Sequence, residues 1–277
     1  MSVEFTPDRP MLLAGCGNMG AALLQGWIAS GIPANAIRVI EPSGADRAVA
    51  AGADAVQVFS AAPTDGIIPG AIVLAVKPQI IGSVTPALRG LIGPDTLVIS
   101  IAAGTTLRTL SSLTGGHARL IRAMPNTPAA VGRGATVMVA RPEVSAEERS
   151  LARSLLSAVG SAYEVEDEAH MDAVTALSGS GPAYVFYMIE CLARAGAELG
   201  LPAALALDLA RDTVAGAGEL AQRSQEGPST LRVQVTSPNG TTAAGLGVLM
   251  SEQGLAPLIH ATLTAAADRS RELGQDK

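Results

Sequence analysis

The chain has 277 residues, of which 48% are hydrophobic and 16% charged, so we expect a folded protein of two domains rather than a disordered one. Its net charge of −6 and its lack of a basic run argue against nucleic acid as a partner. No apolar run approaches the roughly 20 residues of a membrane span, so we expect no membrane partner either.

Composition also bears on location and metal binding. Residues 1–10 include Glu4, Asp8 and two prolines, and they do not resemble a secretory signal. The two cysteines, Cys16 and Cys191, have the spacing of neither a disulfide framework nor a zinc motif. We therefore expect a cytoplasmic protein without a metal site.

Short apolar runs alternate with helical stretches in the first half of the chain. Strands are expected at residues 11–14, 37–40, 55–59, 71–76, 96–101, 119–124 and 135–140. Helices are expected from the end of the first strand to residue 30 and at residues 79–91, 106–114 and 145–158. Several runs are continuously apolar, as in strands that are buried on both faces. The alternation predicts an α/β domain with a doubly wound, mainly parallel sheet.

The second half is helical almost throughout, and we place the boundary near residue 166, which gives domains of residues 1–166 and 167–277. Helices are expected at residues 183–199, 202–224, 228–235, 241–251 and 255–273. The first of these is apolar on most sides, and such a helix must be buried all round. We favour burial against a second copy in a homodimer; the alternative is a central place in its own helical bundle.

The first strand ends in Gly15-Cys16-Gly17-Asn18-Met19-Gly20, which fits the G-x-G-x-x-G pattern of dinucleotide-binding proteins. In that pattern Gly15 permits a tight turn, Gly17 lets the backbone approach the pyrophosphate, and Gly20 allows close packing of helix and strand. The N-terminus of the following helix then faces the phosphate charge. The alternative is a tight turn that binds no ligand.

Glu41 follows the second strand, and Arg47 comes about one turn later. A carboxylate at this place accepts a hydrogen bond from the adenosine ribose and favours NADH. Placing the 2′-phosphate of NADPH about 4–5 Å from this carboxylate would cost about 1–4 kcal/mol of binding free energy. Arg47 would reverse that preference by pairing with the phosphate, and a Glu41 that points to solvent would have no effect on it. The sequence leaves the choice between NADH and NADPH open.

Three further strand ends offer groups to a cofactor, because ligands of open α/β sheets bind at the carboxyl ends of the strands. Ala75-Val76-Lys77-Pro78 ends one strand, and Lys77 is the only lysine besides Lys277. We expect its ammonium at phosphate, ribose or substrate; the alternative is a solvated lysine. Ala102-Ala103 lets the backbone approach the nicotinamide, and Asn126 offers an amide. The alternative for Ala102-Ala103 and for Asn126 is a role in packing or in a turn, without contact to a cofactor.

Thr236-Ser237-Pro238-Asn239-Gly240-Thr241-Thr242 is the most informative segment of the second half. We predict that Ser237 caps a helix whose first residue is Pro238. Hydroxyls and backbone N–H groups would then gather at a helix N-terminus, which suits a small carboxylate. The alternative is an ordinary capped helix start.

Together, six segments resemble the pyrroline-5-carboxylate reductase family in order and spacing, over nearly the whole chain. They are residues 15–20, 75–79, 100–104, 122–128, 177–184 and 235–242. The resemblance implies an N-terminal Rossmann domain and an all-α C-terminal dimerisation domain. It also implies that two helical domains interlock and form the substrate site near the dimer interface, and that dimers assemble into decamers in some members.

The resemblance further implies that the chain reduces the C=N bond of 1-pyrroline-5-carboxylate to L-proline with NADPH or NADH, the last step of proline biosynthesis. The candidate cofactor-binding residues are Gly15, Cys16, Gly17, Asn18, Met19, Gly20, Glu41, Ala75, Val76, Lys77, Pro78, Ala102, Ala103 and Asn126. The candidate substrate-binding residues are Ser237, Asn239, Gly240, Thr241 and Thr242. Thr242, which would face the ring nitrogen, and Lys77 are the candidate catalytic residues.

Three positions depart from the family's pattern. Asn239 stands where a second glycine is usual, and asparagine tolerates the backbone conformations that glycine permits. Met250 stands where an acidic or amide residue is usual, and we expect it to affect packing. Glu41 is not the residue of an NADPH-preferring member, so it bears only on the choice of cofactor.

Two other functions compete with this interpretation. A hydroxyacid dehydrogenase of related architecture normally uses a lysine on a helix of its second domain, and here that domain has none before Lys277. A non-catalytic nucleotide sensor would keep the glycine pattern at residues 15–20 but would not need the segment at residues 237–242.

Overall fold

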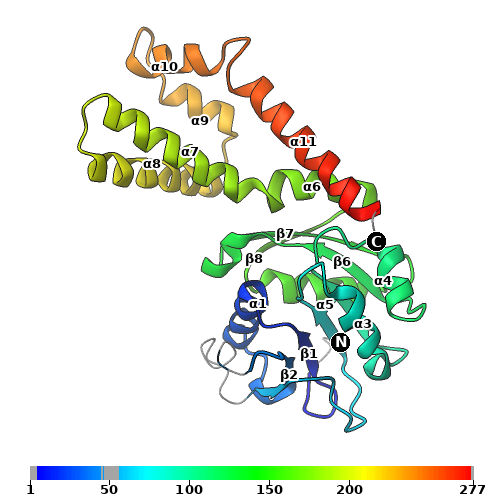
Figure 1. Ribbon diagram of the computed structural model, residues 1–277. Coiled ribbons are helices and arrows are strands. Elements are labelled where there is room, and N and C mark those ends of the chain that lie inside the picture. Colours follow the sequence, from blue (N-terminus) through cyan, green and yellow to red (C-terminus); the bar gives the residue numbers. More distant parts are fainter. Residues whose placement is uncertain (1–4, 45, 47–55, 276–277) are drawn as a thin grey trace. The chain divides into compact units, whose positions relative to one another are not determined.

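The computed structural model describes residues 5–44, 46 and 56–275, and Figure 1 shows its helices and strands. The chain packs into two compact units. The first unit runs to Gly179 and includes the chain again from Ala267 onward, and the second unit is Ser180–Ala266. Each unit is described by itself below.

The first unit contains one sheet, which has eight strands in the described part of the chain. These are β1 (Met11–Ala14), β2 (Ile37–Ile40), β3 (Gln57–Phe59), β4 (Ala71–Leu74), β5 (Leu97–Ser100), β6 (Leu120–Met124), β7 (Gly134–Ala140) and β8 (Gly160–Glu164). Their order is β3-β2-β1-β4-β5-β6-β7-β8, and all neighbours run parallel except β6 and β7. The doubly wound, mainly parallel sheet predicted from the sequence is therefore confirmed.

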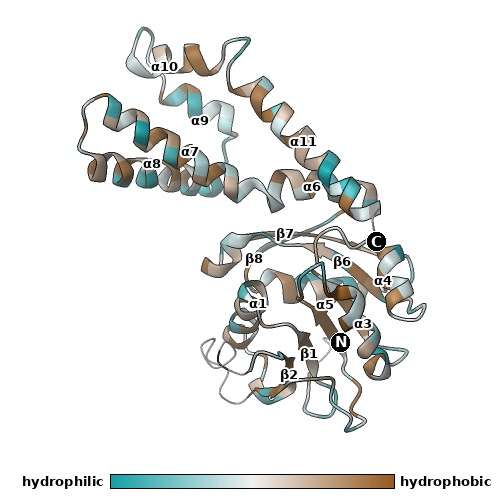
Figure 2. Ribbon diagram, in the orientation of Figure 1, coloured by the Kyte–Doolittle hydropathy of each residue, from teal (hydrophilic) through white to brown (hydrophobic). Residues whose placement is uncertain are grey.

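Helices cover both faces of this sheet because successive side chains of a strand point to opposite faces. Met11 and Leu13 of β1 join a buried core with α1 (Asn18–Ala29) and α5 (Ala146–Ser157). Leu12 and Ala14 join the other core, with α3 (Ile81–Ala87) and α4 (Leu107–Leu113). Figure 2 shows the strands at the centre of the unit as its most hydrophobic part.

The helices of this unit begin and end close to their expected limits. The stretch expected at residues 79–91 is divided into α3 and a 3₁₀ turn, Arg89–Leu91. Pro86 lies inside α3, and proline removes a helical hydrogen bond, which explains the early end. α5 begins with a capping box, in which the Ser145 hydroxyl accepts from the N–H of Glu148, whose carboxylate accepts from the N–H of Ser145.

Strand β8 was not predicted from the sequence. It pairs with β7 at one edge of the sheet, and its residues are exposed or half-buried. An edge strand of this kind lacks the continuous apolar run that marks the buried strands.

The two compact units divide later in the chain than the boundary that we expected near residue 166. Glu168 pairs with the buried Arg122 of β6 at 2.9 Å, and the Ser270 hydroxyl donates to Asp172 at 2.6 Å. These contacts hold the short helices after residue 167 and the end of the last helix within the first unit. The short helices are a 3₁₀ turn (Glu168–His170), α6 (Met171–Val174) and a π-helical turn (Thr175–Gly179).

The second unit is all helical, as predicted. It contains α7 (Gly181–Glu198), α8 (Ala203–Arg223), α9 (Pro228–Gln234), α10 (Thr241–Leu249) and the first part of α11 (Leu255–Gln275). α7 packs along α8, where a Cβ on Gly196 would lie 3.3 Å from the Cβ of Ala206. No described helix has both the length and the apolar character needed to cross a bilayer.

Helix α7 is not the buried centre of its own bundle. None of its residues is fully buried within the chain, and Phe186 and Tyr187 are 58% and 61% exposed. Of the two alternatives drawn from its sequence, the central place in a single-chain bundle is therefore wrong. Apolar side chains remain on its surface, and Figure 2 shows hydrophobic segments along several helices of this unit.

Candidate dinucleotide and substrate sites

The glycine turn after β1 has the geometry that its sequence predicts. Gly15 has a φ of +93°, which favours glycine, and its N–H donates to the carbonyl of Ile40 at 2.8 Å. A Cβ on Gly15 would lie 2.7 Å from the carbonyl oxygen of Ala75. A Cβ on Gly20 would lie 2.2 Å from the carbonyl oxygen of Gly15, so Gly20 allows the helix to pack closely against the turn itself.

Helix α1 begins directly after this turn and presents an uncapped N-terminus. Gly17 is its N-cap and supplies no side-chain acceptor, and the first turn contains no acidic residue. The first N–H groups of a helix have no partner within it, and the helix dipole adds positive potential there. An anion such as a pyrophosphate would therefore be stabilised at this end.

A cavity of about 530 Å³ lies at the carboxyl edge of the sheet. Its walls come from the segments that follow β1, β4, β5 and β6, which are consecutive in the sheet. The chain leaves β1 toward β2 and returns on the other side at β4, so this is the switch point at which open α/β sheets bind ligands. The lining residues are Gly17, Asn18, Met19, Ala75, Val76, Lys77, Pro78, Ile101, Ala102, Ala103, Met124 and Pro125.

The cavity thus gathers predicted cofactor residues that lie far apart in the sequence. Ile101, Met124 and Pro125 line it too, although we did not select them from the sequence. They stand at the ends of the same strands, so position at the carboxyl edge was the signal that would have identified them. Small side chains at Ala75, Ala102 and Ala103 leave room for a flat ring, and a dinucleotide fits this lining.

Lys77 is the one charged residue among those that line the cavity. Its side chain is exposed, and it pairs with no carboxylate in the described part of the chain. The backbone carbonyl of Lys77 accepts from the N–H of Ile80 at 3.1 Å, which fixes the turn that carries the side chain. A cavity with one cation and no acid favours an anionic ligand.

Glu41 does not simply point to solvent, which was one alternative from the sequence. Its Oε2 accepts from the N–H of Cys16 at 2.8 Å, and its Oε1 accepts from the N–H of Ser43 at 3.0 Å. The carboxylate is therefore bonded to the glycine turn across 25 residues of sequence. Arg47, the possible partner of a 2′-phosphate, lies outside the described residues.

Asn126 lies next to the cavity, but its amide is bonded to protein groups. Its Oδ1 accepts from the N–H of Ala135 at 2.8 Å, and its Nδ2 lies 3.2 Å from the carbonyl and 3.3 Å from the hydroxyl of Ser178. Ser178 belongs to the π-helical turn that ends the first of the two chain segments in this unit. This geometry suits a residue that positions the cavity wall better than one that contacts the cofactor.

The predicted substrate residues lie in the second compact unit, at the start of α10. The cap that we predicted there is wrong: the N-cap is Gly240 and the helix begins at Thr241. The N–H of Gly240 donates to the carbonyl of Ser237 at 3.1 Å, so Pro238 and Asn239 are the two central residues of a turn. Asn239 has a φ of +56°, the conformation that glycine would otherwise supply.

The result is again an uncapped helix N-terminus. Gly240 offers no side-chain acceptor, and the first turn of α10 contains no acidic residue. Thr241 and Thr242 are exposed there, so their hydroxyls and the first N–H groups of the helix are accessible to a small carboxylate. Farther along, Met250 lies against Arg232, with 2.6 Å between its Sδ and a guanidinium nitrogen.

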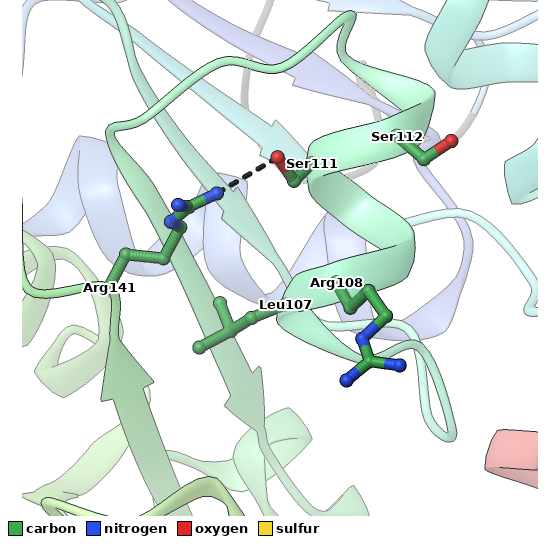
Figure 3. A pocket seen from close by; sticks show the side chains of 5 residues that line it. All are labelled: Leu107, Arg108, Ser111, Ser112 and Arg141. Atoms are coloured by element: carbon green, nitrogen blue, oxygen red, sulfur yellow. Dashed lines mark hydrogen bonds between the residues drawn. The ribbon is translucent and has the colours of Figure 1, made fainter.

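A second hollow of about 300 Å³ lies at α4, and none of the residues that line it is a predicted site residue (Figure 3). It is lined by Leu107, Arg108, Ser111, Ser112 and Arg141. Figure 3 shows the guanidinium of Arg141 turned to the Ser111 hydroxyl, 2.9 Å away, and Glu143 accepts from the same guanidinium. This arginine is thus already engaged with protein groups.

Family models match both parts of the chain. A model described as pyrroline-5-carboxylate reductase dimerisation matches residues 168–273, and one described as NADP oxidoreductase coenzyme F420-dependent matches residues 11–104.

Whole proteins are similar over nearly their full length. The pyrroline-5-carboxylate reductase of Pseudomonas aeruginosa is 41% identical over 94% of this chain and 95% of its own. That of Arabidopsis thaliana is 40% identical over 94% of each chain. The structure of the enzyme from Coxiella burnetii superimposes with a TM-score of 0.89 at 36% identity, over 96% of this chain and 98% of its own. That of the Plasmodium falciparum enzyme, with NADP bound, gives 0.81 at 28% identity, over 97% and 99%.

Proposed function

Because the chain belongs to the pyrroline-5-carboxylate reductase family, we propose that it reduces the C=N bond of 1-pyrroline-5-carboxylate with NADPH or NADH to give L-proline. It is an NAD(P)H-dependent oxidoreductase of proline biosynthesis. The observation that carries the proposal is the cavity of about 530 Å³ at the switch point of the sheet, next to the uncapped N-terminus of α1.

The cofactor binds along the carboxyl edge of the sheet. The N–H groups at the start of α1 hold the pyrophosphate, and Gly17 lets it approach the backbone. Gly15 and Gly20 permit the tight turn and the close packing that place this helix N-terminus. Lys77 lies at the cavity and contacts phosphate, ribose or substrate. Ala102 and Ala103 let the nicotinamide end lie against the backbone.

The substrate carboxylate binds at the start of α10. The backbone N–H of Thr241 and the hydroxyl of Ser237 donate to its oxygens, and charge-assisted hydrogen bonds of this kind are strong. The N–H of Gly240, which donates to the carbonyl of Ser237, closes the turn that carries them, so Gly240 contributes its lack of a side chain. The turn through Asn239 holds these donors in place. The hydroxyl of Thr242 orients the ring nitrogen and passes its proton.

The chemistry needs little more than positioning, because the C=N bond is already electrophilic. A bound reduced nicotinamide supplies a hydride to the ring carbon, a proton reaches the ring nitrogen, and the product is the secondary amine L-proline. The chain holds the carboxylate at one helix N-terminus and the cofactor at another.

A hydroxyacid dehydrogenase remains a weaker candidate. The second unit contains no lysine, since Lys77 and Lys277 are the only ones in the chain. The small side chains and uncapped N–H groups at the start of α10 suit a carboxylate but provide no strong general acid for a carbonyl.

The working unit that we propose is a homodimer formed through the helical unit. Assembly of such dimers into a decamer is what the family resemblance implies for some members. We also propose a reducing compartment such as the cytoplasm, in keeping with Cys16 and Cys191, neither of which forms a disulfide in the structure.

The test is the loss of absorbance at 340 nm with purified protein, 1-pyrroline-5-carboxylate and either cofactor. We expect substrate-dependent oxidation, and we expect Thr242→Ala to lower kcat/KM roughly a hundredfold, because proton transfer and orientation at the nitrogen are lost. Thr242→Ser keeps the hydroxyl and should restore most of the rate.

Thr264→Ala is the matched control, because among the described residues the Thr264 hydroxyl bonds to the carbonyl of His260 within its own helix, α11. It should leave the rate unchanged. Folded protein that binds a cofactor but oxidises none with this substrate would refute the substrate assignment. Unchanged kinetics in Thr242→Ala would refute the role of that hydroxyl alone.

A further inference from the structure

The carboxylate of Glu41 has a fixed place beside the predicted dinucleotide site. Glu41 is the first residue after β2, and β1, which leads into the glycine turn, is the parallel neighbour of β2. The carboxyl ends of both strands therefore meet at the same edge of the sheet. There the carboxylate accepts from the N–H of Cys16 at 2.8 Å and from that of Ser43 at 3.0 Å.

The backbone of Glu41 is held as firmly as its side chain. Its N–H donates to the carbonyl of Phe59 at 2.9 Å, and its carbonyl accepts from the N–H of Gly44 at 3.1 Å. Cys16, which donates to the carboxylate, is fully buried. Moving the carboxylate aside would break a bond to a buried N–H, so the negative charge stays at the glycine turn when a ligand arrives.

This is the place at which dinucleotide-binding folds read the adenosine ribose. An acid about 20 residues beyond the glycine pattern accepts from the ribose 2′-hydroxyl of NAD, whereas an NADP site uses an arginine for the 2′-phosphate. Glu41 lies 21 residues after Gly20. We infer that Glu41 makes this chain select NADH over NADPH. The inference rests on the proposed function, since it assumes that the cavity holds a nicotinamide dinucleotide.

Two cations of the described residues, Arg38 and Lys77, belong to segments close to Glu41 in the sheet. Arg38 of β2 pairs with Asp65 at 2.8 Å and lies over the ring of Phe59. Lys77 follows β4, which is separated from β2 by β1. Arg47 lies outside the described residues, so its effect on the choice between NADH and NADPH is tested with a variant.

The experiment compares NADH and NADPH in kcat/KM at a fixed concentration of 1-pyrroline-5-carboxylate, and in dissociation constant without it. We expect the wild type to favour NADH by about tenfold to several hundredfold, as repulsion between a carboxylate and a 2′-phosphate at about 4–5 Å allows. Glu41→Gln keeps an acceptor for the N–H of Cys16 but removes the charge. This variant should lower the ratio of kcat/KM for NADH to kcat/KM for NADPH at least tenfold, mainly by raising kcat/KM for NADPH.

Glu147→Gln removes one charge from an exposed position in the first turn of α5 and should leave the ratio unchanged. Arg47→Ala should also leave the NADH preference in place. A wild type that favours NADPH, or a ratio that is the same in Glu41→Gln, would overturn the inference while the reductase activity stands. Binding of neither cofactor would overturn both the inference and the proposed function.

Discussion

At the scale of single residues, Asn126 joins the wall of the cofactor cavity to the π-helical turn at residues 175–179. Met124 and Pro125, just before it, line the cavity, whereas its own amide bonds to Ala135 and Ser178. The side chain thus spans two segments that are 9 and 52 residues away along the chain. Its effect on the cavity is expected to pass through the backbone of this loop.

Replacing Asn126 with alanine should lower the free energy of unfolding by about 1–3 kcal/mol, because it removes these bonds and leaves the N–H of Ala135 without its acceptor. Urea denaturation measures this change. The dissociation constant for the cofactor should change less than about threefold. Ser178→Ala removes only the 3.3 Å bond and should cost less. Full stability with a large loss of cofactor affinity would instead support the direct contact predicted from the sequence.

At the glycine turn, the sequence predicted the backbone conformation that the structure has. Gly15 and Gly20 are required by close approaches of 2.7 Å and 2.2 Å that any Cβ would make. The direction of the Glu41 and Asn126 side chains was not predictable, because their partners are fixed only when distant strands come together. Local sequence carries no signal of such contacts.

At the scale of elements, the buried strands were the most predictable part. β1 and β2 have the limits expected from their apolar runs, since every residue in them is buried. The start of α10 was predicted wrongly because a proline suits both the first residue of a helix and the second position of a turn. Asn239 adopts a φ of +56°, which is a turn conformation and not a helical one, so this segment forms a turn.

Strand β2 also contains a buried arginine, and its partner predicts a pH effect. Arg38 is 6% exposed and pairs with Asp65. The N–H of Ile67 above all, together with Arg38, holds the pKa of Asp65 below its usual value. A lowered pKa in the folded state adds stability that is fully present above the unfolded pKa of about 3.9 and is lost as the pH falls through the folded value.

We therefore expect Asp65→Asn to have a lower Tm than the wild type at pH 7, with a difference that persists down to about pH 4 and shrinks below it. Thermal unfolding across that range measures it. Asp208→Asn, at an exposed position on α8 whose nearest cation is 3.9 Å away, is the control and should change little. A Tm difference that is independent of pH would show that the charge of Asp65 is not what stabilises this strand.

At the scale of the whole molecule, the second unit cannot bury its own apolar surface. In this unit only Ala206 and Ala210 are fully buried, whereas large side chains such as Phe186 of α7 remain exposed. Exposed apolar surface of this extent indicates a protein partner. A second copy is the natural one, since a family model for dimerisation matches residues 168–273.

We predict that Phe186→Glu dissociates the oligomer. A buried phenylalanine contributes about 1.5–3 kcal/mol, and a two-fold symmetric interface loses it twice, so the dissociation constant should rise about 10²- to 10⁴-fold. Light scattering after size exclusion should show a multiple of the 27.9 kDa chain mass for the wild type and a smaller mass for the variant. The Tm of the wild type should also rise with protein concentration, because association stabilises the folded state.

Val131→Glu separates the effect of this helix from that of any added surface charge. Val131 is 76% exposed, more than Phe186, but it lies in the first unit. The valine variant should keep the mass of the wild type. An unchanged mass in Phe186→Glu, or dissociation by both variants alike, would contradict assembly through α7. If Phe186→Glu loses reductase activity and Val131→Glu keeps it, the substrate site depends on the assembled helical units, as the family resemblance implies.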